Sequence, residues 1–272
     1  MDAGLDPVIE RVLFPGRTAT GTPSRVRRAL AVARDATLDL LFPPHCASCG
    51  EALPAHTNTA LCLACAQEIN WIGRDRCRRC GDAVGLGAGA VDDCLSCRTH
   101  PPAFVRSACA VARYLEGPVR DLALAMKFSA KLHLTRPLGR LLAERIRATE
   151  LYAPDLVVVP TPLTRHALYQ RGFNQGEEVA ANVARCLRLP LETRLLRKIR
   201  ATPPQATLSH EKRRTNLKGA FACAPRVAAR YKGRRVLLVD DVITTGSTVS
   251  ECARTLVDAG IREVRAAALA RG

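Results

Sequence analysis

Four C-x-x-C pairs within 52 consecutive residues constrain this chain more than any other feature of its sequence. A C-x-x-C turn brings two sulfur atoms to one point, and two such turns supply the four thiolates that tetrahedral Zn²⁺ prefers. We therefore expect two structural zinc ions, because four protein ligands leave no position for a catalytic water. The expected ligands are Cys46, Cys49, Cys62, Cys65, Cys77, Cys80, Cys94 and Cys97.

The spacing leaves the pairing of these turns open. In the simplest scheme the first two pairs bind one zinc and the last two bind the other, whereas a cross-braced scheme joins the first pair to the third. Disulfides are a competing interpretation, which a reducing compartment disfavours, and iron could replace zinc. The residues between the pairs are mostly small or polar, so metal binding would supply folding free energy that apolar burial cannot.

The length of 272 residues and a hydrophobic content of 47% suit a globular chain of two domains. We expect an N-terminal extension over residues 1–40, the zinc module over 41–100 and a larger domain over 101–272. No uninterrupted apolar run approaches the 18 to 20 or so residues of a membrane span, and the first 40 residues lack the pattern of a secretory signal. These features predict a cytoplasmic protein with no membrane span.

Positive charge is concentrated in one part of the chain. The formal net charge is +16, and residues 165–235 hold 17 Lys and Arg against 4 Asp and Glu. This bias predicts an anionic ligand, which could be a small phosphate ester, a nucleic acid or both. The alternative is a solvated basic surface without a specific ligand.

Apolar patterns after the cysteine module alternate between strand and helix. We expect strands at 107–114, 155–160, 235–239 and 263–269, and helices at 118–128, 136–148, 174–189 and 249–259. This order predicts a parallel sheet with right-handed crossovers. Ligands of such sheets bind at the carboxyl ends of the strands, so residues 160–163 and 240–248 should lie on one rim.

The stretch VLLVDDVITTGST (236–248) runs from an expected strand into the last expected helix. Thr248 and Glu251 have the spacing of a capping box, which places a loop before them. Such a loop offers backbone N–H groups, a helix dipole, hydroxyls and a glycine, which together suit a phosphate dianion. The expected phosphate contacts are Thr244, Thr245, Gly246, Ser247 and Thr248.

Asp240 and Asp241 stand directly before this loop, where neighbouring carboxylates repel one another and resist desolvation. They need donors or a cation, which a ribose diol or a Mg²⁺-bound substrate would supply. The alternative is a surface turn whose Asp and Thr side chains only bind nearby backbone amides.

These thirteen residues resemble the phosphoribosyl pyrophosphate (PRPP) motif of type I phosphoribosyltransferases, in which four hydrophobic residues and two acids precede a threonine- and glycine-rich loop. With the cysteine module and the stretches LFPPHCASC, MKFSAKLHL, VVPTPLTRHALYQRGFNQ and TPPQATLSHEKRRTNLKGAF, the chain resembles the ComF family from about residue 41 to residue 272. The resemblance implies an α/β fold, with a small double zinc-ribbon module before a type I phosphoribosyltransferase-like parallel sheet flanked by helices.

The resemblance also implies roles for individual residues. Asp240 and Asp241 would contact the ribose, and residues 244–248 would contact the 5′-phosphate. A loop on the pyrophosphate side would contain Pro160, Thr161, Pro162 and Leu163. A mobile cover would lie around Gln205 and Arg213.

Displacing pyrophosphate from ribose C1 builds positive charge on the sugar and negative charge on the leaving group, so catalysis needs cations beside the pyrophosphate. Mg²⁺ is expected with PRPP. The candidate side chains are Lys127, Arg165, Arg171 and Arg213, each of which could instead be an ordinary surface charge.

Two functions follow from this reading. One is a phosphoribosyltransferase that transfers ribose 5-phosphate to an unidentified nucleophile. The other is a PRPP sensor or a single-stranded-DNA-binding competence protein without turnover, for which the family's name suggests DNA-uptake proteins as partners. The acceptor, the general base and the oligomeric state have no signature in the sequence.

Overall fold

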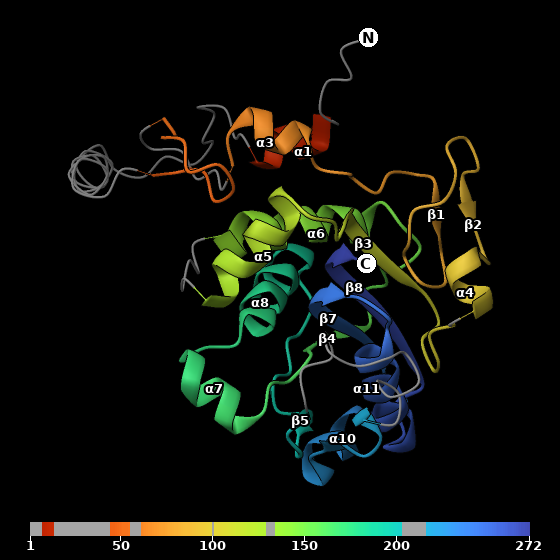
Figure 1. Cartoon of the computed structure of the whole chain (residues 1–272). Helices are drawn as coiled ribbons and strands as arrows, with labels where there is room; N and C mark the ends of the chain where they lie inside the picture. The colour runs from red at the N-terminus through yellow and green to blue at the C-terminus, as the bar shows by residue number, and fades with distance from the viewer. Residues whose placement is uncertain (1–6, 14–43, 55–60, 100, 129–133, 203–215) are drawn as a thin grey trace, which may run out of the picture.

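The computed structural model describes residues 7–13, 44–54, 61–99, 101–128, 134–202 and 216–272. A four-stranded parallel sheet lies at its centre, in the order β3-β8-β7-β4 (Figure 1). Its strands are β3 (Ala108–Arg113), β4 (Leu156–Pro160), β7 (Arg235–Ile243) and β8 (Glu263–Arg271). Strand β4 stops pairing at Val239, whereas β8 pairs with β7 as far as Ile243. The acidic doublet therefore lies on an overhang of β7.

Helices cover both faces of this sheet (Figure 1). One face carries α5 (Pro118–Phe128), α6 (Thr135–Arg147) and α8 (Gln175–Leu187), and the other carries α10 (Pro225–Tyr231) and α11 (Ser247–Asp258). Successive residues of β7 alternate between the two cores, with Leu237 and Val239 in the first and Val236 and Leu238 in the second. A continuous apolar run suits this central strand because both its faces are buried.

All four expected strands and all four expected helices are confirmed, with ends shifted by at most four residues. The sequence did not predict α7 (Arg165–Arg171), α10 or the antiparallel pair β5 (Leu196–Lys198) and β6 (Phe221–Cys223). The first of these helices has a clear start, because the Thr164 hydroxyl accepts the N–H of Ala167 at 3.1 Å. It ends at Gly172, which adopts a left-handed φ of 76°.

Short elements make up the cysteine-rich region. They are α3 (Leu63–Gln67), β1 (Arg76–Cys77), β2 (Ala90–Val91) and α4 (Leu95–Thr99). Before them, α1 (Pro7–Leu13) packs against α6 and buries Ile9, Val12 and Leu13 in the same core as that helix.

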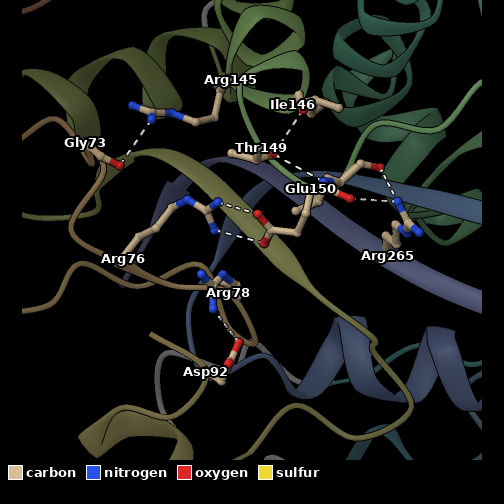
Figure 2. A network of polar contacts seen from close by, with 10 residues as sticks. Gly73, Arg76, Arg78, Asp92, Arg145, Ile146, Thr149, Glu150 and Arg265 are labelled. Atoms are coloured by element: carbon tan, nitrogen blue, oxygen red, sulfur yellow. Dashed lines mark hydrogen bonds and ion pairs between the residues drawn. The ribbon is translucent and has the colours of Figure 1, made fainter. Parts of the chain in front are cut away.

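The second half of the cysteine-rich region is bonded to the parallel sheet and its helices through a polar network, shown in Figure 2. The guanidinium of Arg76 donates to both carboxylate oxygens of Glu150, at 3.1 and 2.5 Å. Arg265 donates to the backbone carbonyls of Glu150 and Leu151, both at 2.9 Å, which holds the same turn from the side of β8. Arg145 of α6 donates to the carbonyl of Gly73 at 3.2 Å. The network therefore joins three separate segments of the chain.

Candidate functional site

The two carboxylates of the doublet accept hydrogen bonds from four donors of the chain. Each accepts the N–H of the following residue, Asp240 from Asp241 at 2.9 Å and Asp241 from Val242 at 2.8 Å. The other two bonds cross to different elements: the Thr161 hydroxyl donates to Asp240 at 2.8 Å, and the Gln175 amide donates to Asp241 at 3.0 Å. The first pair of bonds is what a plain turn would make, whereas the second pair fixes the doublet against the ends of β4 and α8.

The surroundings of Asp240 favour its neutral form. Burial and the close negative charge of Asp241 raise the pKa of Asp240 well above its usual value, and the bond from Thr161 offsets this in part. Burial also lowers the pKa of Lys198, the last residue of β5, while the negative charge of Asp240 favours its protonated form. A carboxyl in this position gains from a ligand that brings hydroxyl donors or a cation.

The loop after β7 leads directly into α11. Gly246 is the N-cap residue, with a left-handed φ of 75°, and as a glycine it offers no side chain to cap the helix. The hydroxyls of Thr245 and Ser247 lie 2.9 Å apart, and the Thr245 hydroxyl also accepts the N–H of Ser247 at 3.3 Å. The first turn of a twelve-residue helix thus faces the loop with its dipole and its N–H groups, which is the arrangement that binds phosphate.

The predicted capping box was wrong. The carboxylate of Glu251 accepts the backbone N–H of Gly219 at 2.7 Å and forms an ion pair with Arg254. These contacts take Glu251 away from the N-terminus of its own helix, and Gly246 rather than Thr248 becomes the N-cap.

The structure places the other predicted site residues on several different elements. Pro160 ends β4, and Thr161, Pro162 and Leu163 follow it directly. Lys127 is half-buried in the last turn of α5. On α7, Arg165 is exposed and Arg171 is half-buried, and this helix projects beyond the edge of the sheet in Figure 1. Gln205 and Arg213 lie outside the described residues.

The eight cysteines form two compact clusters in the sequential scheme. One contains Cys46, Cys49, Cys62 and Cys65, and the other contains Cys77, Cys80, Cys94 and Cys97. Within each cluster, all sulfur atoms lie within 4.8 Å of one another. The cross-braced scheme is therefore wrong.

Sulfur spacing in both clusters fits zinc. Tetrahedral coordination at about 2.3 Å places sulfur atoms about 3.8 Å apart. Three sulfur pairs lie close to this value, at 3.7 Å for Cys49 and Cys62, 3.7 Å for Cys77 and Cys97, and 3.5 Å for Cys80 and Cys94. At Cys46, burial raises the thiol pKa, but backbone N–H groups of the cluster outweigh it and lower the pKa to about 6. Two structural zinc ions match these donors.

Sequence reasoning missed two residues of the rim. Gln175 is only 4% exposed and binds Asp241, and its carbonyl oxygen has no hydrogen-bond partner among the described residues. Its place directly after the helix N-cap Asn174, in the stretch RGFNQ, was the available signal. Lys198 lies in a run of basic residues, from which nothing in the sequence distinguishes it.

Comparisons with known proteins agree with these observations. The double zinc ribbon domain family matches residues 37–98, and the phosphoribosyl transferase domain family matches residues 174–272. Competence protein F of Haemophilus influenzae is 32% identical over 78% of this chain and 90% of its own length. The DNA utilization protein YhgH of Salmonella typhi is 33% identical over 85% of this chain and 99% of its own length.

Solved structures resemble the chain only loosely. Adenine phosphoribosyltransferase of Leishmania tarentolae is 17% identical over 60% of this chain and 78% of that one, with a TM-score of 0.32. Among the described residues, every helix falls short of the length and apolarity that a bilayer crossing requires. With a double zinc ribbon followed by a phosphoribosyl transferase domain, and with close relatives along most of its length, the chain belongs to the ComF family.

Proposed function

We propose that the chain binds PRPP with Mg²⁺ at the rim formed by the ends of β4 and β7. One observation carries this proposal: the doublet Asp240 and Asp241 lies on the overhang of β7, and the same strand leads through Gly246 into the N-terminus of α11. Paired carboxylates bind the hydroxyls of a ribose, and the loop binds its 5′-phosphate. The buried Gln175 oxygen, which has no partner in the described part of the chain, suits a further donor from the ligand.

We further propose that the bound PRPP is a substrate. A nucleophile attacks ribose C1, the bond from C1 to the pyrophosphate oxygen breaks, and pyrophosphate leaves with the bonding electrons. Mg²⁺ would neutralise charge on the leaving group. Lys127, Arg165, Arg171 and Arg213 are the proposed side-chain cations, residues 160–163 the proposed pyrophosphate loop, and Gln205 with Arg213 part of the proposed cover.

The proposed function implies that the chain is divided into three parts. Residues 101–272 would carry the PRPP site, residues 41–100 would form the double zinc ribbon, and residues 1–40 would form an N-terminal extension. The location that suits two thiolate-bound zinc ions and this substrate is the reducing cytoplasm.

Titration calorimetry with PRPP and Mg²⁺ tests the binding step. We expect measurable heat with zinc-loaded protein and at least about a tenfold loss of affinity in Asp241→Asn, since a charge-assisted hydrogen bond contributes about 1.5–3 kcal/mol. Gln170→Leu on the exposed face of α7 is the control. The proposal fails if the zinc-loaded protein binds no PRPP, or if Asp241→Asn binds it as well as the unchanged chain.

Phosphorus NMR tests turnover. We expect pyrophosphate to appear when protein, PRPP, Mg²⁺ and a panel of nucleobases and amines are combined. Binding without pyrophosphate release, with every acceptor, would favour the sensing function.

The second candidate is binding of single-stranded DNA, which the names of the competence and DNA utilization relatives favour. The basic segment 165–235 would provide phosphate contacts, and only 4% of residues are aromatic, which leaves few platforms for base stacking. Affinity for an oligonucleotide should therefore fall steeply between about 50 and 200 mM salt. A flat salt response would exclude this candidate.

A further inference from the structure

Arg271 lies at the end of β8. It stands between the second cysteine cluster, which contains Cys77, Cys80, Cys94 and Cys97, and residues 244–248, which we call the phosphate loop because of its proposed ligand. It is only 6% exposed. Its Nε donates to the carbonyl of Cys80 at 3.2 Å. Its Nη1 donates to the carbonyls of Ile243 at 3.3 Å and of Thr244, and to the backbone oxygen of Gly272. One buried cation therefore bonds to a predicted zinc ligand and to the first residue of the phosphate loop.

The positive charge of Arg271 lies between two sites that are expected to carry negative charge. The guanidinium bonds to backbone oxygens of Cys80 beside the cluster, of Ile243 and Thr244 at the start of the loop, and of Gly272. A zinc ion with four thiolates carries a formal double negative charge, and so does a phosphate ester that is fully ionised. A buried cation between two such sites stabilises both, since it is screened weakly by solvent.

The second cluster is also tightly packed against the sheet at this point. The N–H of Ala108 in β3 donates to the carbonyl of Arg78 at 2.9 Å. A Cβ at Gly81 would come within 3.0 Å of the Cα of Cys109, so only glycine allows this approach. Cys80 and Arg271 line a small cavity together with Thr245 and Gly246 of the phosphate loop. The second cluster and the loop are therefore joined by packed backbone and by the shared lining of this cavity.

The first cluster has no such connection in the described structure. Its contact with the larger domain is a hydrogen bond of 2.6 Å from the Ser48 hydroxyl to Asp121 of α5, together with packing in the core beside that helix. The two zinc sites thus differ in their distance from the loop, and the first serves as an internal control.

We propose that Arg271 couples the second zinc site to phosphate binding at residues 244–248. Zinc on Cys77, Cys80, Cys94 and Cys97 would raise the affinity of the loop for a phosphate ester, and a bound phosphate ester would by reciprocity slow the loss of that zinc. The identity of the ester rests on the proposed PRPP function, but the coupling between cluster and loop does not. Arg271 acts here as a positioning residue.

Cysteine alkylation in the presence of a zinc chelator tests the coupling in the unchanged chain. Mass spectrometry reports the labelling rate of each cluster separately, with and without PRPP and Mg²⁺. We expect PRPP to slow labelling of the second cluster by about five- to tenfold, a typical coupling between sites, and to change that of the first by less than about twofold. Equal protection of both clusters would overturn the proposal, because it would report general stabilisation of the fold.

Arg271→Lys keeps the charge but loses the planar fork that reaches several carbonyls. We expect it to remove the selective protection of the second cluster. Arg265→Lys is the matched control, because Arg265 also donates to two carbonyls from β8 but lies at the opposite end of the strand. Selective protection that survives in Arg271→Lys would contradict the assigned role.

Hydrogen exchange without ligand separates this inference from the PRPP proposal. We expect amides of residues 244–248 to exchange several-fold faster in Cys94→Ser, which opens the second cluster, and in Arg271→Lys. Cys62→Ser, in the first cluster, should leave these amides unchanged. If PRPP does not bind but this pattern holds, only the ligand assignment fails. If the loop exchanges alike in Cys94→Ser and Cys62→Ser, the coupling itself is wrong.

Discussion

Asp240 shows how a single residue can be unfavourable for the fold and yet suit the proposed ligand. Its carboxyl is buried beside a second carboxylate, and its pKa is raised for these two reasons. A group whose pKa is higher in the folded chain contributes stability below its unfolded pKa and loses that contribution as pH rises through the folded value. At neutral pH the ligand-free protein therefore retains an electrostatic cost at this position.

Asp240→Asn should remove that cost while keeping the acceptor atom that Thr161 and the N–H of Asp241 use. We expect the ligand-free variant to be more stable by about 0.5–2 kcal/mol at pH 7.5, as is typical when a functional residue is replaced. The gain should shrink toward pH 4, where the unchanged carboxyl is protonated. Denaturant unfolding at both pH values measures this, and a variant less stable than the unchanged chain at pH 7.5 would contradict it.

Gln175 supports Asp241 directly, so replacing it should reduce the affinity for PRPP. Its amide orients Asp241 at 3.0 Å from the N-terminus of α8. Gln175→Leu keeps the volume but removes the donor, so we expect about a five- to twentyfold loss of PRPP affinity, in line with a net bond of about 1–2 kcal/mol to a charged group. Calorimetry with Gln170→Leu as control measures it, and an unchanged affinity would show that Asp241 needs no support from α8.

At the scale of elements, the sequence predicted the strands and helices that follow from local residue patterns. It missed the strand extension, the cap and the side-chain contact that depend on tertiary contacts. The strand at 235–239 follows from its apolar run, but its extension to Ile243 depends on pairing with β8, which no local pattern contains. The capping box failed because Gly219 and Arg254, brought close by the fold, bind Glu251. The contact of Gln175 with Asp241 joins residues 66 positions apart and was likewise invisible.

The turn into α11 gives a prediction that isolates the phosphate loop. Gly246 and Gly233 both have a φ of 75°, and a Cβ at either would meet open space. Alanine at each position should cost a similar free energy of unfolding, about 1–2 kcal/mol, because only the left-handed backbone is strained. Gly246→Ala should also weaken PRPP binding severalfold, since its methyl group would stand where the phosphate approaches, whereas Gly233→Ala should not. Equal affinities in the two variants would argue against a phosphate at this loop.

At the scale of the whole molecule, polar bonds hold the zinc-binding region to the parallel sheet. The central ion pair joins Arg76, whose side chain is 6% exposed, to Glu150, which is 40% exposed. Burial raises the pKa of Glu150, but the hydrogen bonds from Arg76 outweigh it and lower the pKa overall. The contribution of this pair is therefore present above the unfolded pKa of the carboxyl and is lost as pH falls through the folded value.

The unequal burial of these partners predicts unequal costs of removing them. Glu150→Leu leaves a buried guanidinium without its carboxylate and should cost about 3 kcal/mol, whereas Arg76→Leu leaves a carboxylate that water can reach and should cost about 1 kcal/mol. The pair of Arg78 and Asp92, exposed by 43% and 81%, is the control, and its removal should leave the stability nearly unchanged because water screens both charges. Denaturant unfolding of the zinc-loaded protein measures Glu150→Leu, Arg76→Leu and the corresponding leucine variants of Arg78 and Asp92. Only the cost of leaving a buried charge unpaired differs between the two partners. If Arg76→Leu lowers the free energy of unfolding as much as Glu150→Leu does, the loss comes from packing between the zinc module and the sheet and not from an unpaired charge.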